Sequence, residues 1–249
     1  MSIHIAQFSD THLFANQTQL HVGANVFENL KRVLLSLATN KAIDIIIFTG
    51  DLTQDHTVES YKAFVDLIRN TPITQPVYFL SGNHDEPLLM AEHLVDFPFC
   101  SDNLIETEHW QLFLVPTKSD TPAGFVEKNT LDAMQKKCAP NKYQWLFMHH
   151  HPINVGYFID RHPLLNQDDF WQAVSKQTTL RGVCCGHVHQ GLDLLQEETD
   201  KLCDVLTCPA TSIQFDPLVD GVAALPLGPG YRLLDLHDDG TYSSEIFYL

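Results

Sequence analysis

Three consecutive histidines, His149, His150 and His151, follow the apolar run Trp-Leu-Phe-Met at residues 145–148 and precede Pro152. Imidazole nitrogens are common metal ligands in proteins. Successive side chains of a β-strand point to opposite faces, so three neighbours cannot all reach one ion. The motif therefore predicts a metal ligand among the three and does not by itself decide which histidine it is.

Similar clusters of Asp, Asn and His follow four other apolar segments. The five clusters are S-D-T-H at residues 9–12, G-D at 50–51, S-G-N-H-D at 81–85, H-H-H at 149–151 and G-H-V-H at 186–189. Each cluster alone is typical of a turn. The carboxyl ends of neighbouring strands meet at one crevice of an open α/β sheet, so the five together predict one shared site.

The residue types of these clusters favour a particular chemistry. Carboxylate, amide and imidazole ligands suit manganese, iron or zinc. The set offers more ligands than one ion needs, and the two oxygens of Asp51 could bridge two ions about 3.5–4 Å apart, an arrangement that displaces groups at phosphorus. A competing interpretation is a zinc site of Cys185, His187 and His189. Cys184 and Cys185 are better explained as free thiols of a buried strand.

Apolar periodicity predicts the elements that position these clusters. Strands are expected at residues 3–8, 43–49, 76–80, 111–115, 143–148, 180–185, 202–207, 231–236 and 243–248, and helices at residues 26–38, 58–69, 127–137 and 168–176. The alternating order of strands and helices in the first half favours parallel pairing with helices packed on the sheet. The second half is richer in strands. The order of strands and helices along the chain predicts an α/β fold in which two packed sheets are flanked by helices.

Composition limits the classes of partner. The chain has 249 residues, of which 44% are hydrophobic, and no linker-like segment, so we expect a single domain over residues 1–249. A net charge of −16 repels nucleic acids and anionic membranes. Neither a long apolar run for a membrane span nor a secretory signal is recognisable. We therefore expect a cytoplasmic protein with reduced cysteines and a small-molecule substrate.

The polar clusters also resemble the motifs of a known family. D-x-H, G-D, G-N-H-D, H-H-P and G-H-x-H occur here in the order found in the calcineurin-like metallophosphoesterase superfamily. The segments DTHLFA, GDLTQD, CGHVHQ, TSIQF and GYRLLDLHDDGT further resemble the bacterial class III 3′,5′-cyclic AMP phosphodiesterases. The resemblance implies a four-layer αββα sandwich and two divalent metal ions, iron or manganese, with zinc as the alternative.

The resemblance also implies a set of metal ligands. It assigns Asp10, His12 and His189 to one ion, Asn83, His150 and His187 to the other, and Asp51 to a bridge between them. In the H-H-P motif of the family the ligand is the histidine two positions before proline, which is His150. His151 is the alternative ligand, and His149 is expected to face away from His150.

These assignments predict hydrolysis of a phosphodiester. Two ions would offset the phosphate charge and lower the pKa of a bridging water to about 7, which yields a hydroxide nucleophile. Attack on cyclic AMP would expel the 3′ oxygen and give 5′-AMP. His84 is expected to stabilise the phosphoryl oxygens and protonate the leaving oxygen. Asp85 would orient His84 or cap the next helix, and Asn83, His162 and Asn166 are candidate substrate contacts.

Two other functions fit parts of the sequence. The first is hydrolysis of another phosphodiester or of a phosphomonoester, because the metal ligands contact only phosphate. These motifs contain no arginine that could clamp a monoester, which disfavours a protein phosphatase. The second is a non-catalytic scaffold, which would be expected to lack ligands or His84. All seven ligand positions and His84 are present.

Overall fold

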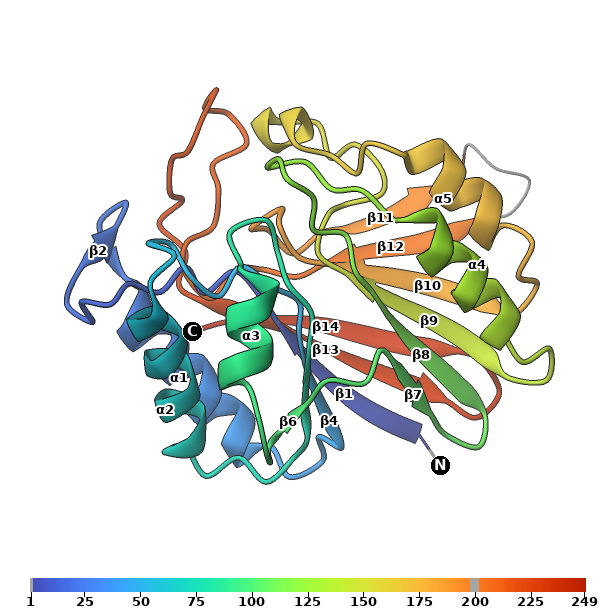
Figure 1. The fold of residues 1–249 in the computed structure, drawn as a ribbon, viewed down its shortest axis with the longest axis horizontal. Coiled ribbons are helices and arrows are strands. Elements are labelled where there is room, and N and C mark those ends of the chain that lie inside the picture. The colour runs from blue at the N-terminus through green and yellow to red at the C-terminus, as the bar shows by residue number, and fades with distance from the viewer. Residues whose placement is uncertain (1, 198–201) are drawn as a thin grey trace.

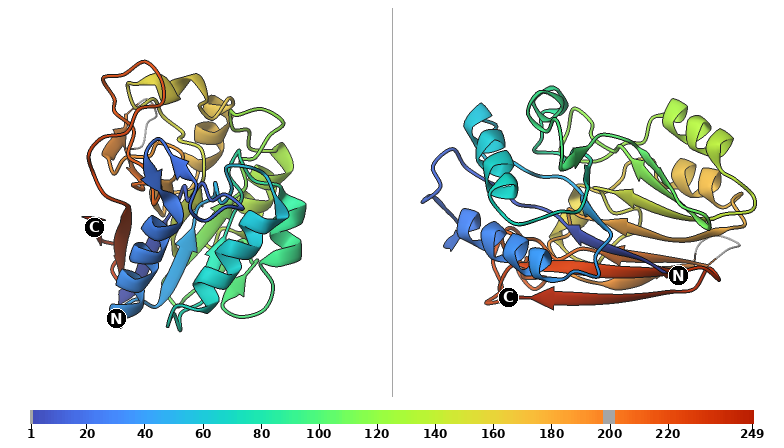
Figure 2. Two further views of the ribbon diagram at one scale, coloured as in Figure 1. Left: turned by 90° about the vertical axis from the view of Figure 1, so that its left-hand side faces the viewer. Right: turned by 90° about the horizontal axis from the view of Figure 1, so that it is seen from below.

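A computed structural model of the protein describes residues 2–197 and 202–249. Two six-stranded sheets pack face to face, and helices cover both outer faces (Figure 1, Figure 2). The arrangement confirms the predicted four-layer αββα sandwich. No helix of the described residues is both long enough and apolar enough to cross a membrane.

The first sheet has the strand order β14-β13-β1-β4-β5-β6. Its strands are β1 (Ser2–Phe8), β4 (Ile45–Phe48), β5 (Val77–Phe79), β6 (Phe99–Cys100), β13 (Gly230–His237) and β14 (Tyr242–Tyr248). Strands β1, β4, β5 and β6 are parallel to one another. Strand β13 is antiparallel to its neighbour β1, and β14 is antiparallel to β13. Phe8 pairs with Phe48, and Phe48 pairs with Phe79. The clusters that follow these three strands therefore begin side by side.

The second sheet has the order β11-β12-β10-β9-β8-β7. Its strands are β7 (Leu104–Glu106), β8 (Trp110–Val115), β9 (Tyr143–Met148), β10 (Leu180–Cys185), β11 (Asp193–Gln196) and β12 (Cys203–Thr207). The four central strands are parallel, and the two edge strands β7 and β11 are antiparallel. Met148 pairs with Cys185, so the H-H-H and G-H-V-H clusters also start next to each other.

Helices cover each sheet because their apolar residues recur on one face. The helical elements are α1 (Val26–Thr39), α2 (Val58–Arg69), α3 (Pro87–His93), α4 (Lys128–Lys137), α5 (Gln167–Val174) and the 3₁₀ helix η1 (Phe158–Arg161). In α1, Val26, Leu30, Val33 and Leu37 are buried at helical spacing. Asn25 caps this helix by accepting a hydrogen bond from the backbone N–H of Glu28. A small hairpin of β2 (Leu20–His21) and β3 (Ala24–Asn25) precedes α1.

Apolar side chains form three layers between these elements. One layer lies between the first sheet and α1 and α2, and another between the second sheet and α4 and α5. The inner layer joins the two sheets and includes Ile5 and Ile47 from the first and Trp145 and Phe147 from the second. Along β9, the residues at odd positions therefore face the opposite sheet.

The predicted strands and helices are all present, with shifts of a few residues at their ends. The strand expected at residues 43–49 begins at Ile45, and the helix expected at 168–176 ends at Val174. The strand expected at residues 202–207 begins at Cys203, and the preceding residues 198–201 lie outside the described part. The structure adds α3, β6, β7 and β11, which the periodicity did not predict.

Candidate metal centre

The loops that follow the parallel strands of the two sheets contact one another. The backbone N–H of Asp10 donates to the carbonyl of Gly50 at 2.9 Å, which joins the first two clusters. The backbone N–H of His187 lies 3.1 Å from both carboxylate oxygens of Asp10. This last contact connects a loop of the second sheet to a loop of the first. The five predicted clusters therefore form a single site.

The backbone of this site is strained. Eight non-glycine residues of the described chain have a positive φ, and five of them are the predicted ligands Asp10, His12, Asp51, His187 and His189, with φ between 47° and 66°. Residues with a side chain rarely adopt this region. Such strain is retained when surrounding contacts enforce it, and it is concentrated at functional sites.

Two glycines of the motifs are required by close packing. A Cβ atom at Gly82 would lie 2.2 Å from Oδ1 of Asp51, and one at Gly186 would lie 2.1 Å from Oγ of Ser9. Neither position has room for a side chain. The glycines of G-N-H-D and G-H-x-H thus allow the ligand-bearing loops to approach one another.

The first group of potential ligands comprises Asp10, His12 and His189. Nδ1 of His189 donates to the carbonyl of Ile213 at 2.9 Å, so Nε2 is the nitrogen that remains available to a metal. That nitrogen lies 3.0 Å from Nε2 of His12 and 3.4 Å from Oδ1 of Asp10. The three predicted ligands of the first ion therefore converge on one point.

The second group contains Asp51, Asn83 and His149. Nδ1 of His149 donates to the carbonyl of Thr49 at 2.7 Å. Nε2 of the same ring lies 3.4 Å from Oδ2 of Asp51 and 3.1 Å from Oδ1 of Asn83. Oδ2 of Asp51 is also 3.6 Å from Nε2 of His12. Asp51 therefore lies between the two groups, as expected of a bridging residue.

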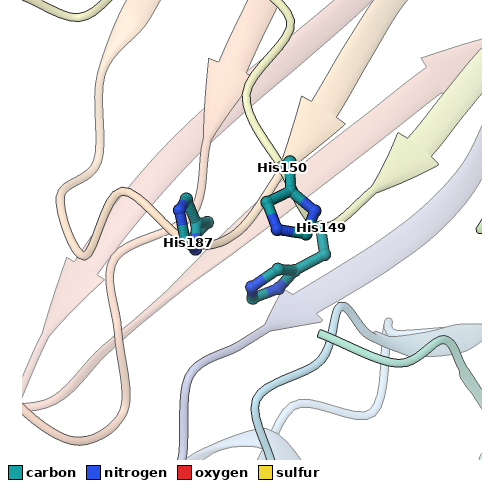
Figure 3. A group of neighbouring side chains, drawn as sticks. All are labelled: His149, His150 and His187. Carbon is teal, nitrogen blue, oxygen red and sulfur yellow. The ribbon is translucent and has the colours of Figure 1, made fainter. Parts of the chain in front are cut away.

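His187 lies beside the second group, and Figure 3 shows its ring together with those of His149 and His150. Its Nε2 donates to the backbone carbonyl of His162 at 3.0 Å, which leaves Nδ1 with the lone pair. His162 was predicted to contact the substrate. In the structure its carbonyl orients His187.

The predicted orientations of His149 and His150 are reversed. His149 follows Trp145 and Phe147 on the inner face of β9 and so points toward Asp51 and Asn83. His150 points to the outer face, where Nδ1 is 2.7 Å from Oγ1 of Thr117 and Nε2 is 3.1 Å from the carbonyl of Pro122. Both faces of β9 are apolar, so the sequence did not show which one faces the first sheet.

His151, the alternative predicted ligand, has a third environment. Its Nε2 lies 3.1 Å from Oδ1 of Asp160, and its ring stacks beside that of His187 at a centroid distance of 5.6 Å. Asp160 also accepts hydrogen bonds from the backbone N–H groups of Val155 and Gly156. His151 therefore connects the centre to the loop that carries η1.

Burial and charge set the protonation of the site. Burial lowers the pKa values of His12 and His187 well below the ordinary value, so both rings are neutral at pH 7, the form that binds metals. Burial would also lower the pKa of His149, but the carboxylates of Asp51 and Asp10 outweigh it and raise the pKa to about 9. The site therefore attracts positive charge.

The donor set fits divalent metal ions. Imidazole nitrogens lie 3.0–3.4 Å from one another and from carboxylate oxygens, close enough for one cation to contact several of them at once. Nitrogen and oxygen donors suit manganese, iron or zinc. Among the described residues, no candidate ligand group includes a cysteine. Burial raises the pKa of Cys185, which disfavours the thiolate that the competing zinc interpretation requires.

The G-N-H-D loop places His84 at the edge of the centre. Its backbone N–H donates to Oδ1 of Asp51 at 2.8 Å, and its ring meets that of His12 edge-on at 4.8 Å. Nδ1 of His84 has no hydrogen-bond partner among the described residues. Burial lowers the pKa of this imidazole. An unpartnered nitrogen beside the ligands suits a group that transfers a proton to a substrate.

Asp85 holds the loops in place. Its carboxylate accepts 2.8 Å hydrogen bonds from the backbone N–H groups of Asp51, Leu52 and Gly82. Glu86, and not Asp85, occupies the N-cap position of α3. The predicted contact of Asp85 with His84 is replaced by this support of the bridging ligand's backbone.

Asn166, a predicted substrate contact, has both polar atoms of its side chain engaged elsewhere. Oδ1 accepts from the backbone N–H of Val126, and Nδ2 donates to the carbonyl of the same residue. The side chain thereby ties the start of α5 to the segment before α4. Asn83, by contrast, lies in the centre as expected.

Sequence reasoning missed several groups that support the ligands. The carbonyls of Thr49, Ile213 and His162 orient three histidines, and a backbone oxygen leaves no signal in the residue types. Phe215 lies flat on His189, with ring centroids 3.9 Å apart and planes 3° from parallel. Phe215 belongs to the TSIQF segment, in which a resemblance was the only signal.

Comparison with known proteins places this geometry in a family. The profile described as "Calcineurin-like phosphoesterase" matches residues 3–191, which contain all of the predicted ligands. This chain belongs to the calcineurin-like phosphoesterase family. Proteins of this family are hydrolases, and the two ligand groups joined by Asp51 agree with the dinuclear metal site of such phosphoesterases.

Similar sequences extend over the whole phosphoesterase chain. A "Probable cyclic nucleotide phosphodiesterase" from Colwellia psychrerythraea is 50% identical over 99% of this chain and 95% of its own length. The "3′,5′-cyclic adenosine monophosphate phosphodiesterase CpdA" of Escherichia coli strain K12 is 31% identical over 99% of this chain and 90% of its own length. Both are full-length likenesses.

Solved structures support the fold. A dimetal phosphatase from Danio rerio superposes with a TM-score of 0.68 and covers 94% of this chain and 95% of its own, at 9% sequence identity. At that identity the likeness concerns the fold alone. It agrees with the four layers described above.

Proposed function

We propose that this phosphoesterase hydrolyses cyclic nucleotides, with 3′,5′-cyclic AMP as substrate and 5′-AMP as product. The observation that carries the proposal is the pair of buried ligand groups that share Asp51, in a chain whose full-length relatives are named cyclic nucleotide phosphodiesterases. Two divalent ions, iron or manganese with zinc as the alternative, are the proposed cofactors.

The proposed ligands differ from the sequence prediction at one position. Asp10, His12 and His189 would hold one ion, Asn83, His149 and His187 the other, and Asp51 would bridge. His149 replaces His150 because its Nε2 points at Asp51 and Asn83, whereas both ring nitrogens of His150 contact other groups. The carbonyl of Thr49 fixes the tautomer of His149, as is usual for histidine ligands.

The ions, when bound, would neutralise phosphate charge and activate water in a protein whose net charge of −16 otherwise repels an anionic substrate. The chain's own residues would direct the reaction. Water gives up one proton to the solvent and adds to phosphorus, the bond to the 3′ oxygen breaks, and His84 gives a proton to the departing oxygen and regains one from the solvent. The negative charge of the bound phosphodiester favours the protonated form of His84, which burial alone disfavours.

The test is hydrolysis by protein that has been stripped with chelator and reloaded with Mn²⁺ or Fe²⁺. We expect negligible turnover of cyclic AMP in the stripped protein and recovery on reloading, with 5′-AMP as the product in chromatography. A generic aryl phosphodiester is measured in parallel. Metal-dependent cleavage of the aryl ester without any cleavage of cyclic AMP would reject the proposed substrate and retain the metal centre. Inactivity toward both, with two ions shown to be bound, would reject the enzymatic function.

A further inference from the structure

A cavity of about 550 Å³ is lined by residues at the start of α3 and of the segment that joins β8 to α4. Figure 1 shows where these two parts of the chain lie. The lining residues that bear on its function are Glu86, Lys118, Asp120, Phe125 and Glu127. Its volume is in the range of small-molecule sites, about 300–1,000 Å³. Glu86 is only two residues beyond His84. The cavity is therefore lined by the same loop that carries the proposed proton donor.

Lys118 joins this cavity to the metal centre. Its Nζ donates to the backbone carbonyl of Asn83 at 2.7 Å, while the amide oxygen of Asn83 lies 3.1 Å from Nε2 of His149. An ammonium group has three donors, so two remain available after this bond. The residue that precedes His84 thus has its side chain in the metal centre and its carbonyl at the cavity.

His150 fixes the segment that forms the opposite wall. Its two ring nitrogens contact Thr117 and Pro122, and a Cβ atom at Gly124 would lie 2.4 Å from Cγ of its ring. The segment from Thr117 to Phe125 is thereby folded around this histidine. Adjacent residues of one loop, His149 and His150, thus position the centre and the cavity wall relative to each other.

The charges of the cavity exclude a phosphate as its occupant. Three carboxylates, of Glu86, Asp120 and Glu127, surround one ammonium group, that of Lys118. An anion would be repelled, and a neutral group with N–H donors would be attracted. Phe125 is 37% exposed and offers an aromatic face to a planar ring. A purine base has such a ring and carries N–H donors for the carboxylates, and the hydroxyl of an attached ribose can accept a hydrogen bond from Lys118.

We infer that this cavity binds the nucleoside part of the cyclic nucleotide, with the base against Phe125 and the ribose beside Lys118. The inference rests on the proposed function. It follows the direction of the reaction, because His84 protonates the 3′ oxygen and the ribose that carries this oxygen must lie on the His84 side. The metal centre binds the phosphate, and the cavity supplies the affinity that a substrate without a base does not gain.

The test compares variants on two substrates that differ only in the base. These are cyclic AMP and the 3′,5′-cyclic phosphate of methyl riboside, which has no base. We expect Phe125→Ala to raise KM for cyclic AMP about tenfold, in line with the loss of one base–aromatic contact, and to leave KM for the riboside within twofold. Phe125→Tyr keeps the ring and should keep the wild-type KM. Glu86→Gln should raise KM for cyclic AMP more than KM for the riboside, whereas Lys118→Met should raise both, because both substrates contain the ribose.

Inhibition gives a second measurement. Phe125→Ala should raise the Ki of 5′-AMP about tenfold and leave the Ki of inorganic phosphate unchanged, because phosphate contacts the metal centre only. If Phe125→Ala keeps the wild-type KM for cyclic AMP, or raises both KM values equally, the inference is overturned and the proposed function stands. A wild-type protein that cleaves the aryl phosphodiester and no cyclic nucleotide would overturn both.

Discussion

Three adjacent histidines with the same chemistry have three different functions here. Side-chain alternation separates the first two, since His149 faces the first sheet and the centre and His150 faces the segment before α4, while the loop beyond β9 turns His151 toward Asp160. Each ring is buried, so each needs partners for its nitrogens. The partners, and not the residue type, therefore determine which histidine is free to bind a metal.

The number of bound metal ions distinguishes the proposed functions of His149 and His150. His149→Ala should bind one ion fewer than the wild-type protein after dialysis and lose more than about 100-fold in turnover of an aryl phosphodiester, since even outer partners of ligands are worth about 10–100-fold. His150→Ala should retain both ions, because the ring of His150, although it lies near His149 and His187, has both nitrogens hydrogen-bonded to Thr117 and Pro122. Elemental analysis by mass spectrometry measures both. Loss of an ion from His150→Ala and none from His149→Ala would restore the original assignment.

At the scale of elements, the long strands and helices were predictable and the short ones were not. Strands such as β9 and β10 are continuous apolar runs, and α1 repeats its buried residues at helical spacing. In contrast, β6 has two residues, and α3 has seven with Met90 as its buried residue. Periodicity cannot be recognised over so few positions, and tertiary pairing decides such segments.

The sequence predicted most of the side chains of the site, but not which of the adjacent histidines points into it. The side chains that converge on the centre were found because Asp, Asn and His are unusual at the ends of apolar strands. The choice between His149 and His150 required the packing of the two sheets, which sequence does not show for a strand with two apolar faces. The main-chain oxygens of Thr49 and Ile213 and the cavity beside Lys118 depend on the folded backbone alone.

Asp160, in the loop that carries η1, makes the stability of the folded protein depend on pH. Burial opposes the charge of Asp160, but hydrogen bonds from His151 and from the N–H groups of Val155 and Gly156 outweigh it and hold the pKa of this carboxyl below its usual value. The folded protein therefore binds this proton less readily than the unfolded chain. Its stabilisation is complete above the unfolded pKa of about 4 and is lost as the pH falls through the lower folded value.

Asp160→Asn should accordingly reduce the free energy of unfolding of the metal-free protein by about 1.5–3 kcal/mol at pH 7. The difference from wild type should shrink as the pH is lowered from 5 to 3. Urea unfolding at several pH values measures it. Glu245→Gln removes an exposed carboxylate of β14 and serves as the control, with little change expected. A difference that grows toward low pH would contradict the assignment of the charged form.

At the scale of the whole molecule, the centre depends on the contact between the two sheets. Asp10, Asp51 and Asn83 follow strands of the first sheet, and the histidines at 149, 187 and 189 follow strands of the second. Neither sheet carries all of the proposed ligands of either ion. The apolar layer between them, with Trp145 and Phe147 at its middle, therefore maintains the distances on which the site depends.

One polar residue also joins the sheets. Arg232 of β13 is fully buried, and its guanidinium donates to the carbonyls of Thr207 and Leu192 on the second sheet's side. It also contacts Oγ of Ser244 at 2.6 Å and Oδ1 of Asp193 at 2.8 Å. The guanidinium of Arg232 is thus the shared partner of all these groups. Its removal would leave buried acceptors without a donor.

Arg232→Met keeps much of the side-chain volume and removes every donor. We expect it to lower the free energy of unfolding by about 1–3 kcal/mol, the cost of leaving buried carbonyl acceptors without a donor. Arg181→Met is the matched control, because Arg181 lies over the ring of Tyr143 and its loss should cost about 1 kcal/mol or less. Urea unfolding of metal-free protein measures both. A cost below about 1 kcal/mol for Arg232→Met would mean that apolar packing alone holds the sheets, and with them the two halves of the metal centre, together.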